Sequence, residues 1–388
     1  MTRGMGKVLL VYPHNFLDRN MGTNIRVYSL AKVLRERGYD LDLYACRNMF
    51  SSFDRWDEMN AEEKLVDKLY LYDFRQTQRY QKKCLKNRVN RLLWREELET
   101  WVTPCMLNQF RQIVSSASYN YIVMFYAYTA ELLSPAHYVG DACKVYFMED
   151  FLSMNQYAAG TFKCIGSMLD SELKRVGYFD KIVCISWDEK ILFEKLLADK
   201  RFYFLPHIIE RNGKCSPKKI RTKKVLFVGA VNAFNIEGVK WFLREVYPLV
   251  DVETDITIAG KVTDCIEPMN LPNVHVKGYV ESLESLYAET DVVICPLLNG
   301  TGMKIKVIEA MSHGLPVVCT SRGVDGLPDK TRNGCIVSDT AKGFADSINR
   351  LLTDAVFYKE CQENVCRYFS DVLDWSVNKE TISEIFCG

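Results

Sequence analysis

The sequence predicts an α/β protein with two Rossmann-like domains, each built on a parallel sheet. Short apolar runs alternate with segments of helical length along most of the chain, a rhythm typical of βαβ units. The rhythm stops in the polar and basic stretch 210–224, which carries Gly and Pro, and then starts again. Such a break is expected of a linker. The 388 residues agree with two domains at roughly 150 residues each.

The N-terminal half opens with a strand pattern. KVLLVY at 7–12 is a continuous apolar run of the kind that is buried on both faces of a sheet. A helix is predicted over 24–37, with Ile25, Tyr28, Ala31 and Leu34 on one face, and Gly38 ends it. Further strands are expected at 40–45, 121–125, 144–148, 181–185 and 202–205, and a capping box opens a helix over 186–197.

The C-terminal half repeats this alternation. Helices are predicted at 238–250, 283–289 and 303–313, and the tail from 340 is mostly helical. The strands between them are expected at 225–229, 255–259, 274–276, 291–295 and 316–320. We therefore predict domains over 1–207 and 225–388 with a linker over 208–224. The last helix is also a candidate to pack back on the N-terminal domain.

Composition argues against several classes of protein. Fifty Lys and Arg against 49 Asp and Glu leave a formal net charge of +1, so a dedicated nucleic-acid binder is not indicated. Fourteen cysteines are spread singly, without CxxC or zinc-type spacing, which favours a reducing, cytoplasmic compartment. No signal core and no run of 18 apolar residues occurs. With five His and no HExxH, we expect no cofactor and no protein-bound metal.

One segment is strongly basic. The stretch 75–95 carries eight Lys and Arg and no acidic residue, and Leu92, Leu93 and Trp94 lie among them. A solvated helix face is one interpretation. The other is a surface that binds anionic lipid headgroups or an anionic acceptor. A nucleic-acid patch is the least favoured alternative.

The strongest candidate site is the segment 296–318, PLLNGTGMKIKVIEAMSHGLPVV. Gly300 and Gly302 follow a predicted strand and let the backbone approach a ligand closely. The next helix would offer free N–H groups to a phosphate. Lys304 in its first turn is unfavourable for the helix dipole unless an anion lies beside it, and Glu309 can accept hydrogen bonds from vicinal hydroxyls. An ordinary βα turn with a surface Lys and Glu is the alternative.

This segment resembles the donor site of family-4 glycosyltransferases, which have the GT-B fold. The stretches 227–250 and 274–297 are similar to the opening of their C-terminal domain and to the residues before the donor loop, and 22–43 resembles their first helix and second strand. The match is loose between 46 and 141. The resemblance implies two domains facing across a cleft, a nucleotide-sugar on the C-terminal domain, an acceptor on the N-terminal one, and transfer with retention.

The resemblance also implies roles for single residues. Glu309 matches the second Glu of the family's E-x7-E pattern, which contacts the nucleotide ribose, whereas Thr301 stands where the first Glu is expected. The usual cations are missing from 230–236, and Lys304 and Lys306 are expected to supply the pyrophosphate charge instead. The implied donor-binding residues are Gly22, Gly229, Gly300, Thr301, Gly302, Met303, Lys304, Lys306 and Glu309.

Acceptor residues are expected after the N-terminal strands. Glu149 and Asp150 end the strand 144–148, and in related sequences an acidic residue here lies near the acceptor, where it can orient a hydroxyl or take its proton. His14, Tyr126, Tyr128 and Asp150 are the acceptor-binding candidates. Glu149, Asp150 and Lys304 are the catalytic candidates. For each, a loop, cap or packing role is the alternative.

These features predict a glycosyltransferase that moves a sugar from a nucleotide-sugar to a hydroxyl of a saccharide or lipid-linked acceptor, in glycan or cell-envelope polysaccharide synthesis. No second carboxylate is placed for a covalent glycosyl intermediate, which favours same-face attack assisted by the leaving phosphate. A degenerate GT-B protein that acts as a scaffold, or a GT-B epimerase or phosphorylase, stays open. A dehydrogenase is disfavoured because PHNFLDRNMGTN replaces GxGxxG after the first strand.

Overall fold

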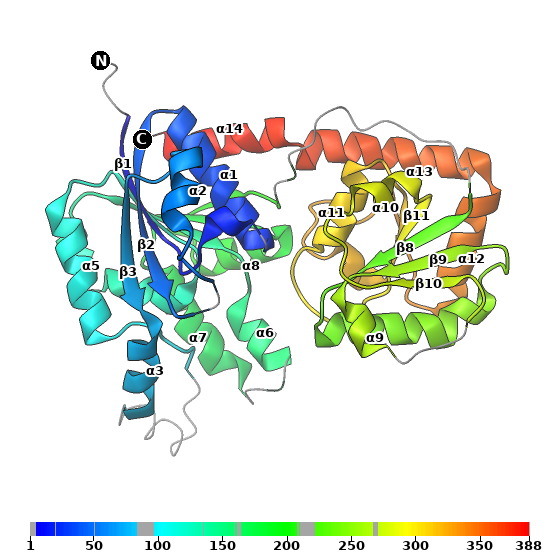
Figure 1. Cartoon of the computed structure of the whole chain (residues 1–388), viewed down its shortest axis with the longest axis horizontal. Helices are drawn as coiled ribbons and strands as arrows, with labels where there is room; N and C mark the ends of the chain where they lie inside the picture. Colours follow the sequence, from blue (N-terminus) through cyan, green and yellow to red (C-terminus); the bar gives the residue numbers. More distant parts are fainter. Residues whose placement is uncertain are drawn as a thin grey trace. The chain divides into compact units, whose positions relative to one another are not determined.

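The computed structural model describes residues 5–19, 21–49, 51–83, 97–134, 136–158, 160, 164–207, 209, 222–266 and 271–387. It divides into two compact units (Figure 1): unit 1 is Met1–Leu205 with Lys379–Gly388, and unit 2 is Pro206–Asn378. Unit 1 thus ends at 205, two residues before the predicted boundary at 207, and it also includes the last ten residues, which lie in and after the helix named above as a candidate to pack on the N-terminal domain. Most of the predicted linker, 210–221, lies outside the described residues.

Unit 1 is built on a seven-stranded parallel sheet with the order β3-β2-β1-β4-β5-β6-β7. In register, Val8 lies opposite Leu41 on one side and Tyr121 on the other. Strand β3 was not predicted from the sequence, because only one residue of this edge strand is fully buried. The strands are β1 (Gly6–Val11), β2 (Tyr39–Arg47), β3 (Lys68–Asp73), β4 (Tyr121–Met124), β5 (Cys143–Met148), β6 (Lys181–Cys184) and β7 (Arg201–Phe204).

Helices cover this sheet because its strands are apolar on both faces. Leu9 and Val11 belong to a core with Phe110 and Met168, contributed by two helices, while Val8 and Leu10 of the same strand are buried on the opposite face. The helices are α1 (Gly22–Glu36), α2 (Trp56–Glu63), α3 (Phe74–Lys83), α5 (Pro104–Ser116), α6 (Leu152–Ala158), α7 (Ile165–Val176), α8 (Trp187–Leu196) and α14 (Trp375–Phe386), the last with its residues from Lys379 onward in unit 1.

Unit 2 has a six-stranded parallel sheet with the order β10-β9-β8-β11-β12-β13. Phe227 and Ile294 face a core that includes Phe344, whereas Leu226 and Val293 face one that includes Ile308. The strands are β8 (Lys224–Val228), β9 (Asp255–Ala259), β10 (Val274–Lys277), β11 (Val292–Cys295), β12 (Val317–Cys319) and β13 (Cys335–Val337). The helices are α9 (Ala233–Trp241), α10 (Glu284–Glu289), α11 (Ile305–Ser312), α12 (Ala341–Thr353) and α13 (Ala355–Tyr368).

Two helices of unit 2 begin elsewhere than the sequence predicts. Helix α9 begins at Ala233, five residues before the predicted start, because the side chain of Asn232 accepts a hydrogen bond from the backbone N–H of Asn235 and caps it. Helix α11 begins at Ile305, so that Lys304 is its N-cap rather than a residue of its first turn. The prediction of two parallel α/β domains is otherwise confirmed.

Both sheets are doubly wound, and each has one point where the strand order reverses. In unit 1 the reversal lies between β1 and β4, and in unit 2 between β8 and β11. The crossovers on either side of such a point run in opposite directions and leave a crevice at the carboxyl ends of the strands, where ligands bind in this class of fold. The topology therefore predicts one ligand-binding position in each unit, at the carboxyl ends of the strands beside the reversal.

Unit 1 holds the end of helix α14. The ammonium of Lys181 donates to the carbonyl oxygen of Ile385 at 2.6 Å, and the hydroxyls of Tyr39 and Tyr121 donate to that of Phe386 at 2.8 and 2.9 Å. These three donors satisfy carbonyls that a helix end leaves without partners, and the cation also suits the negative end of the dipole. Among the described residues, no helix combines the length and apolar character needed to cross a membrane.

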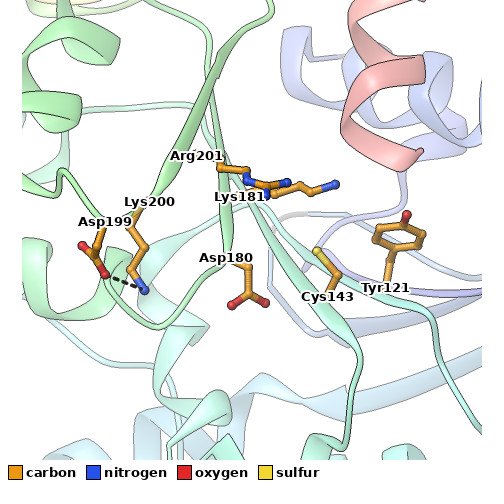
Figure 2. A pocket seen from close by; sticks show the side chains of 7 residues that line it. All are labelled: Tyr121, Cys143, Asp180, Lys181, Asp199, Lys200 and Arg201. Atoms are coloured by element: carbon orange, nitrogen blue, oxygen red, sulfur yellow. Dashed lines mark ion pairs between the residues drawn. The ribbon is translucent and has the colours of Figure 1, made fainter. Parts of the chain in front are cut away.

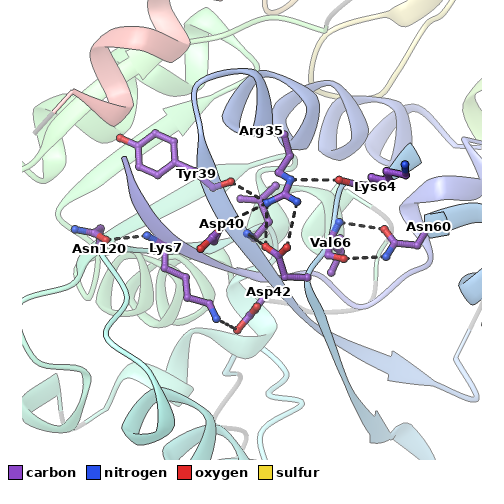
Figure 3. Close-up of polar contacts among 11 residues, drawn as sticks. Lys7, Arg35, Tyr39, Asp40, Asp42, Asn60, Lys64, Val66 and Asn120 are labelled. Carbon is purple, nitrogen blue, oxygen red and sulfur yellow. Dashed lines mark hydrogen bonds and ion pairs between the residues drawn. The ribbon is translucent and has the colours of Figure 1, made fainter. Parts of the chain in front are cut away.

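A polar network ties the amino ends of the strands of unit 1 together (Figure 3). The fully buried carboxylate of Asp42 on β2 lies 2.8 Å from the ammonium of Lys7 and accepts a hydrogen bond from the hydroxyl of Tyr119 at 2.6 Å. The backbone N–H of Lys7 donates to the side chain of Asn120 at 2.8 Å. This buried carboxylate thus joins β1, β2 and the segment that enters β4.

We expect Asp42→Ala to destabilise the protein by about 2–4 kcal/mol, because it leaves the buried partners of a paired carboxylate unsatisfied. The matched control is Asp40→Ala on the same strand, whose carboxylate is 68% exposed and pairs with Arg35 at 3.5 Å. It should cost less than about 1 kcal/mol. Urea unfolding followed by circular dichroism measures both. Equal losses in the two variants would contradict the importance assigned to the buried carboxylate.

Candidate functional site

The loop between β11 and α11 lies at the switch point of unit 2. Gly300 and Gly302 have φ angles of +105° and +74°, in the left-handed region that favours glycine. A Cβ on Gly300 would lie 3.2 Å from the ring of Phe234 on α9. On the same helix, a Cβ on Gly238 would lie 2.5 Å from the carbonyl oxygen of Pro296. The loop therefore passes directly over the first turns of α9, so the close approach at Gly300 is to the ring of Phe234, whereas the predicted approach to a ligand stays a prediction.

Lys304 braces this loop. Its ammonium donates to the carbonyl oxygens of Thr301 and Gly302, at 2.9 and 2.6 Å, and the residue is buried. These contacts turn the cation toward the loop's own backbone. Met303 packs against Gly326, where a Cβ would lie 3.1 Å from its Cα. The contacts of Gly300, Lys304 and Met303 thus hold the predicted loop 300–304 in one conformation.

Lys306 brings a cation to the end of β8. Its ammonium donates to Oδ1 of Asn235 on α9 at 2.6 Å and lies 4.3 Å from the centroid of the Phe227 ring. Residues 230–236, which form the turn between β8 and the start of α9, contain no cation. Lys306 of α11, on the other side of the switch point, brings a positive charge to this turn. Burial lowers the pKa of Lys306 to about 8, the charge of Lys304 adds to this lowering, and the carboxylate of Glu309 opposes it.

Glu309 is held by a neighbouring tyrosine. It lies three residues after Lys306 on α11, and its Oε2 accepts a hydrogen bond from the hydroxyl of Tyr287 on α10 at 2.9 Å. Burial raises the pKa of Glu309, and the Tyr287 hydrogen bond and the Lys306 charge both oppose this rise. The ring of His313 stacks on Tyr287 at 4.7 Å. Gly229, the other predicted donor residue, follows β8 directly.

The predicted acceptor residues of unit 1 gather at the carboxyl ends of β1 and β4. The rings of His14 and Tyr126 are 6.3 Å apart, and Tyr126 and Tyr128 are 6.5 Å apart. Two residues that the sequence analysis missed complete this cluster: Tyr12 stacks on Tyr126 at 6.1 Å, and Trp101 stacks on Tyr128 at 4.5 Å. Burial lowers the pKa of His14 to about 4, so that its imidazole is neutral at pH 7.

Glu149 and Asp150 follow β5 and have different surroundings. The side chain of Glu149 is 5% exposed and lies 3.3 Å from Nε of Arg26 on α1. Burial raises the pKa of Glu149 to about 7, with Arg26 opposing the rise and Asp150 adding to it. Asp150 is exposed and accepts a hydrogen bond from Asn155 at 3.2 Å. Gly22, the remaining predicted residue of this unit, is the first residue of α1.

The start of α1 buries polar residues that the periodicity did not reveal. Ile25, placed on the buried face by the sequence analysis, is exposed, whereas Asn24 and Arg26 are fully buried. Oδ1 of Asn24 accepts a hydrogen bond from the hydroxyl of Tyr12 at 2.6 Å. Apolar spacing identifies the face that packs on the sheet, but it gives no signal for polar side chains that pack at a sheet edge.

A cavity of about 410 Å³ lies at the opposite edge of unit 1, at the amino ends of β4 to β7 (Figure 2). No predicted site residue lies in it. Its charged groups are partly paired with each other, since the ammonium of Lys200 lies 3.5 Å from the carboxylate of Asp199. The lining residues are Tyr121, Cys143, Asp180, Lys181, Asp199, Lys200 and Arg201. Because ligands of doubly wound sheets bind at the carboxyl edge, this cavity is not the candidate site.

The described residues also bear on metal binding. Within them, no group of three or more His, Cys, Asp or Glu side chains is close enough together to hold a metal ion. The charged side chains around this loop include Lys304, Lys306 and Glu309, and also Glu237 on α9, whose carboxylate accepts hydrogen bonds from Asn299 at 3.0 and 3.2 Å.

Comparisons with known proteins agree with this geometry. Residues 222–354 match the model of the family described as glycosyl transferases group 1. Over 254 residues the chain is 26% identical to an uncharacterized 44.6 kDa protein of the cps region of Klebsiella pneumoniae. That alignment covers 58% of this chain and 64% of the relative, so it spans less than two thirds of the relative's length.

Solved structures share the fold across the whole chain. Anabaena HepE in complex with UDP and glucose is 14% identical, with a TM-score of 0.67 and coverage of 98% of this chain and 99% of that one. A TarM variant of S. aureus, in complex with fondaparinux, α-GlcNAc-glycerol and UDP, is 12% identical, with a TM-score of 0.66 and coverage of 99% and 100%. The chain has the GT-B fold, and its C-terminal unit carries a domain of the glycosyl transferases group 1 family.

Proposed function

We propose that this chain is a glycosyltransferase that moves a sugar from a nucleotide-sugar to a hydroxyl of a saccharide or lipid-linked acceptor. One observation carries the proposal. The glycine loop, Lys306 and Glu309 meet at the switch point of unit 2, inside the segment that matches the glycosyltransferase family. UDP and glucose in the HepE complex, and the cps region of the Klebsiella relative, support a nucleotide-sugar donor and a role in cell-envelope polysaccharide synthesis.

The donor is proposed to bind through complementary charges. Glu309 accepts hydrogen bonds from the ribose hydroxyls, with Tyr287 fixing its carboxylate. Lys306 faces the pyrophosphate at the β8–α9 turn, and the N–H groups at the start of α11 add to it, since Lys304 caps that helix without a side-chain hydrogen bond. These groups stabilise the negative charge that grows on the phosphate as the sugar leaves, without a protein-bound metal.

In the transfer step, a hydroxyl of the acceptor must lie next to the anomeric carbon of the donor sugar. The acceptor oxygen bonds to this carbon while the bond to the phosphate oxygen breaks and gives its electron pair to the nucleotide. For retention by same-face attack, the hydroxyl proton passes to that phosphate oxygen. The cluster of unit 1 is proposed to bind the acceptor, with the rings of Tyr126 and Tyr128 beside its sugar and Glu149 beside its hydroxyl.

A scaffold protein is the second candidate. The observation that favours it is Thr301, which stands where the family's first glutamate contacts the sugar. A scaffold of this kind would bind nucleotide-sugars without consuming them. An assay of nucleotide-sugar consumption with and without saccharide acceptors therefore separates the two candidates.

We also propose that the basic segment 75–95 binds an anionic membrane surface. Residues 84–96 lie outside the described residues, and helix α3 covers the first part of the segment. Each added cation near an anionic surface is worth about 1 kcal/mol. The proposal therefore rests on the charge pattern of the sequence.

The membrane proposal predicts salt-sensitive sedimentation with vesicles that contain anionic lipid, and little with neutral vesicles. A variant with Lys82, Lys83, Lys86 and Arg88 changed to Gln should sediment less. The matched control changes Lys195, Lys200, Arg201 and Lys342 to Gln, which removes the same charge elsewhere. Equal and negligible sedimentation of all three proteins would contradict membrane binding. The segment would then be a solvated helix face, and a soluble acceptor would be favoured.

The donor site predicts that Glu309→Gln weakens binding of the preferred nucleotide-sugar by about 1.5–3 kcal/mol, because a charged hydrogen-bond partner is lost. Tyr287→Phe should weaken it less, by about 1 kcal/mol, since it removes only the hydroxyl that orients Glu309. The ligand is chosen by thermal shift across UDP-, GDP-, ADP- and CMP-sugars. Calorimetry measures the affinities, with Glu360→Gln, an exposed glutamate on α13, as control. Unchanged affinity in Glu309→Gln would overturn the ribose assignment.

The lowered pKa of Lys306 predicts a pH dependence. In the free protein its ammonium loses its proton as pH rises through about 8, so binding of the diphosphate must then take up a proton. Affinity should fall by up to about tenfold per pH unit above this point. Lys306→Ala should bind weakly and lose this dependence, whereas Lys304→Ala should keep it. EDTA should leave wild-type activity intact. A pH dependence that persists in Lys306→Ala would place the phosphate charge elsewhere.

A further inference from the structure

The strongest unexplained feature of unit 1 is a buried arginine on α1. Arg26 is 0% exposed and is the largest fully buried side chain among the described residues. Its Nε lies 3.3 Å from Oε1 of Glu149, and the centre of its guanidinium lies 5.5 Å from the centroid of the Phe147 ring. Within the described part of the chain, Nε, Nη1 and Nη2 have no hydrogen-bond acceptor in good geometry, and neither does Oε1 of Glu149 have a donor.

Stability does not account for this pair. Removing a guanidinium and a carboxylate from water costs several kcal/mol per ion, and the attraction between them offsets this cost only where further hydrogen bonds satisfy both groups. Here the three guanidinium nitrogens of Arg26 and Oε1 of Glu149 lack such bonds among the described residues. A pair of apolar side chains of similar volume would hold α1 on β5 at least as well. The pair is therefore retained for what the charges do.

The groups around Glu149 show what Arg26 contributes. The charge of Glu149 helps to raise the pKa of Tyr12 after β1, of Tyr126 after β4 and of Tyr146 on β5, and the neighbouring carboxylate of Asp150 acts on Glu149 itself. Burial and Asp150 both favour the protonated form of Glu149, and Arg26 is the cation that opposes them. The tyrosines are neutral, because burial raises the pKa of Tyr12 and of Tyr126.

The place of the pair in the fold completes the argument. Glu149 follows the last residue of β5, next to the end of β4, which borders the switch point of unit 1. The largely buried carboxylate lies at the edge where the acceptor cluster gathers, while the arginine behind it has no exposed surface. Arg26 can thus act on a ligand only through Glu149.

We propose that Arg26 is a positioning residue that holds Glu149 as a carboxylate, so that Glu149 accepts a hydrogen bond from the attacking hydroxyl of the acceptor. The inference rests on the proposed function. In the transfer step Glu149 keeps its charge and orients the hydroxyl, while the hydroxyl proton passes to the leaving phosphate oxygen. Without Arg26 the carboxylate takes up a proton, becomes a hydrogen-bond donor and no longer orients the nucleophile.

The test is the pH profile of nucleotide-sugar consumption between pH 5.5 and 9, with the donor selected by thermal shift and with water or a saccharide as acceptor. Wild type should lose activity as pH falls through about 7, where Glu149 takes up its proton. Arg26→Gln removes the opposing cation, so this limb should move to higher pH. The loss should be about tenfold at pH 7 and small at pH 9, with the KM of the donor unchanged.

Two companion variants sharpen the test. Arg26→Lys keeps a cation and should shift the limb less than Arg26→Gln. Glu149→Gln should have low kcat and no limb near pH 7. A loss in Arg26→Gln that is equal at all pH values would overturn the inference and indicate a structural role only.

A further variant covers failure to fold. If Arg26→Gln does not fold, the double variant Arg26→Gln, Glu149→Gln removes both charges and should unfold at or above the wild-type temperature. An unfolded double variant would show that the pair holds the fold and would overturn the inference. A folded wild type that binds and consumes no nucleotide-sugar would instead overturn the proposed function, so the two failures are distinguishable.

Discussion

Each half of this molecule depends on one constraint: its sheet is entirely parallel, and the central strands of the sheet are buried on both faces. Parallel strands require long crossovers, and the crossovers here place helices on both faces of each sheet. Winding outward in both directions from β1 and from β8 leaves one reversal in each sheet. The candidate donor loop and the candidate acceptor cluster lie at these two reversals. The position of the chemistry is therefore a consequence of how the apolar strands are covered.

The charged groups at these edges carry a cost that the cores must outweigh. Lys306, Glu149 and Arg26 are all largely or fully buried. Burial lowers the pKa of Lys306 and of Arg26 and raises the pKa of Glu149, so in each case it favours the neutral form. The buried carboxylate of Asp42 in unit 1 has two close partners, Lys7 and Tyr119, both at Oδ2, while its Oδ1 has no hydrogen-bond partner among the described residues. Both carboxylates thus keep one unsatisfied oxygen, but only Glu149 also has an arginine partner without hydrogen bonds, at the edge where the candidate acceptor residues gather.

Much of the fold could be predicted from the sequence, because buried strands have a local signature. KVLLVY at 7–12 and the run up to Cys295 were recognisable as strands, and the glycine loop after β11 as the turn that leads into a helix. The errors fell where local pattern is weak. Edge strand β3 is only partly buried, and the start of α9 is set by a side-chain cap at Asn232 rather than by apolar spacing. The helix placed from 303 begins at Ile305, because Lys304 folds back on the loop.

The sequence by itself determined the alternation of strands and helices, the break between the two halves, and the glycine loop proposed to bind the donor, because each of these features depends on a few neighbouring residues. Only the tertiary structure decided which side chains meet. The cation missing after β8 comes from Lys306 on α11, and the partner of Glu149 comes from α1, more than a hundred residues earlier. Apolar periodicity reports which face of a helix is buried, but the contacts of a buried polar group depend on the order of strands in the sheet.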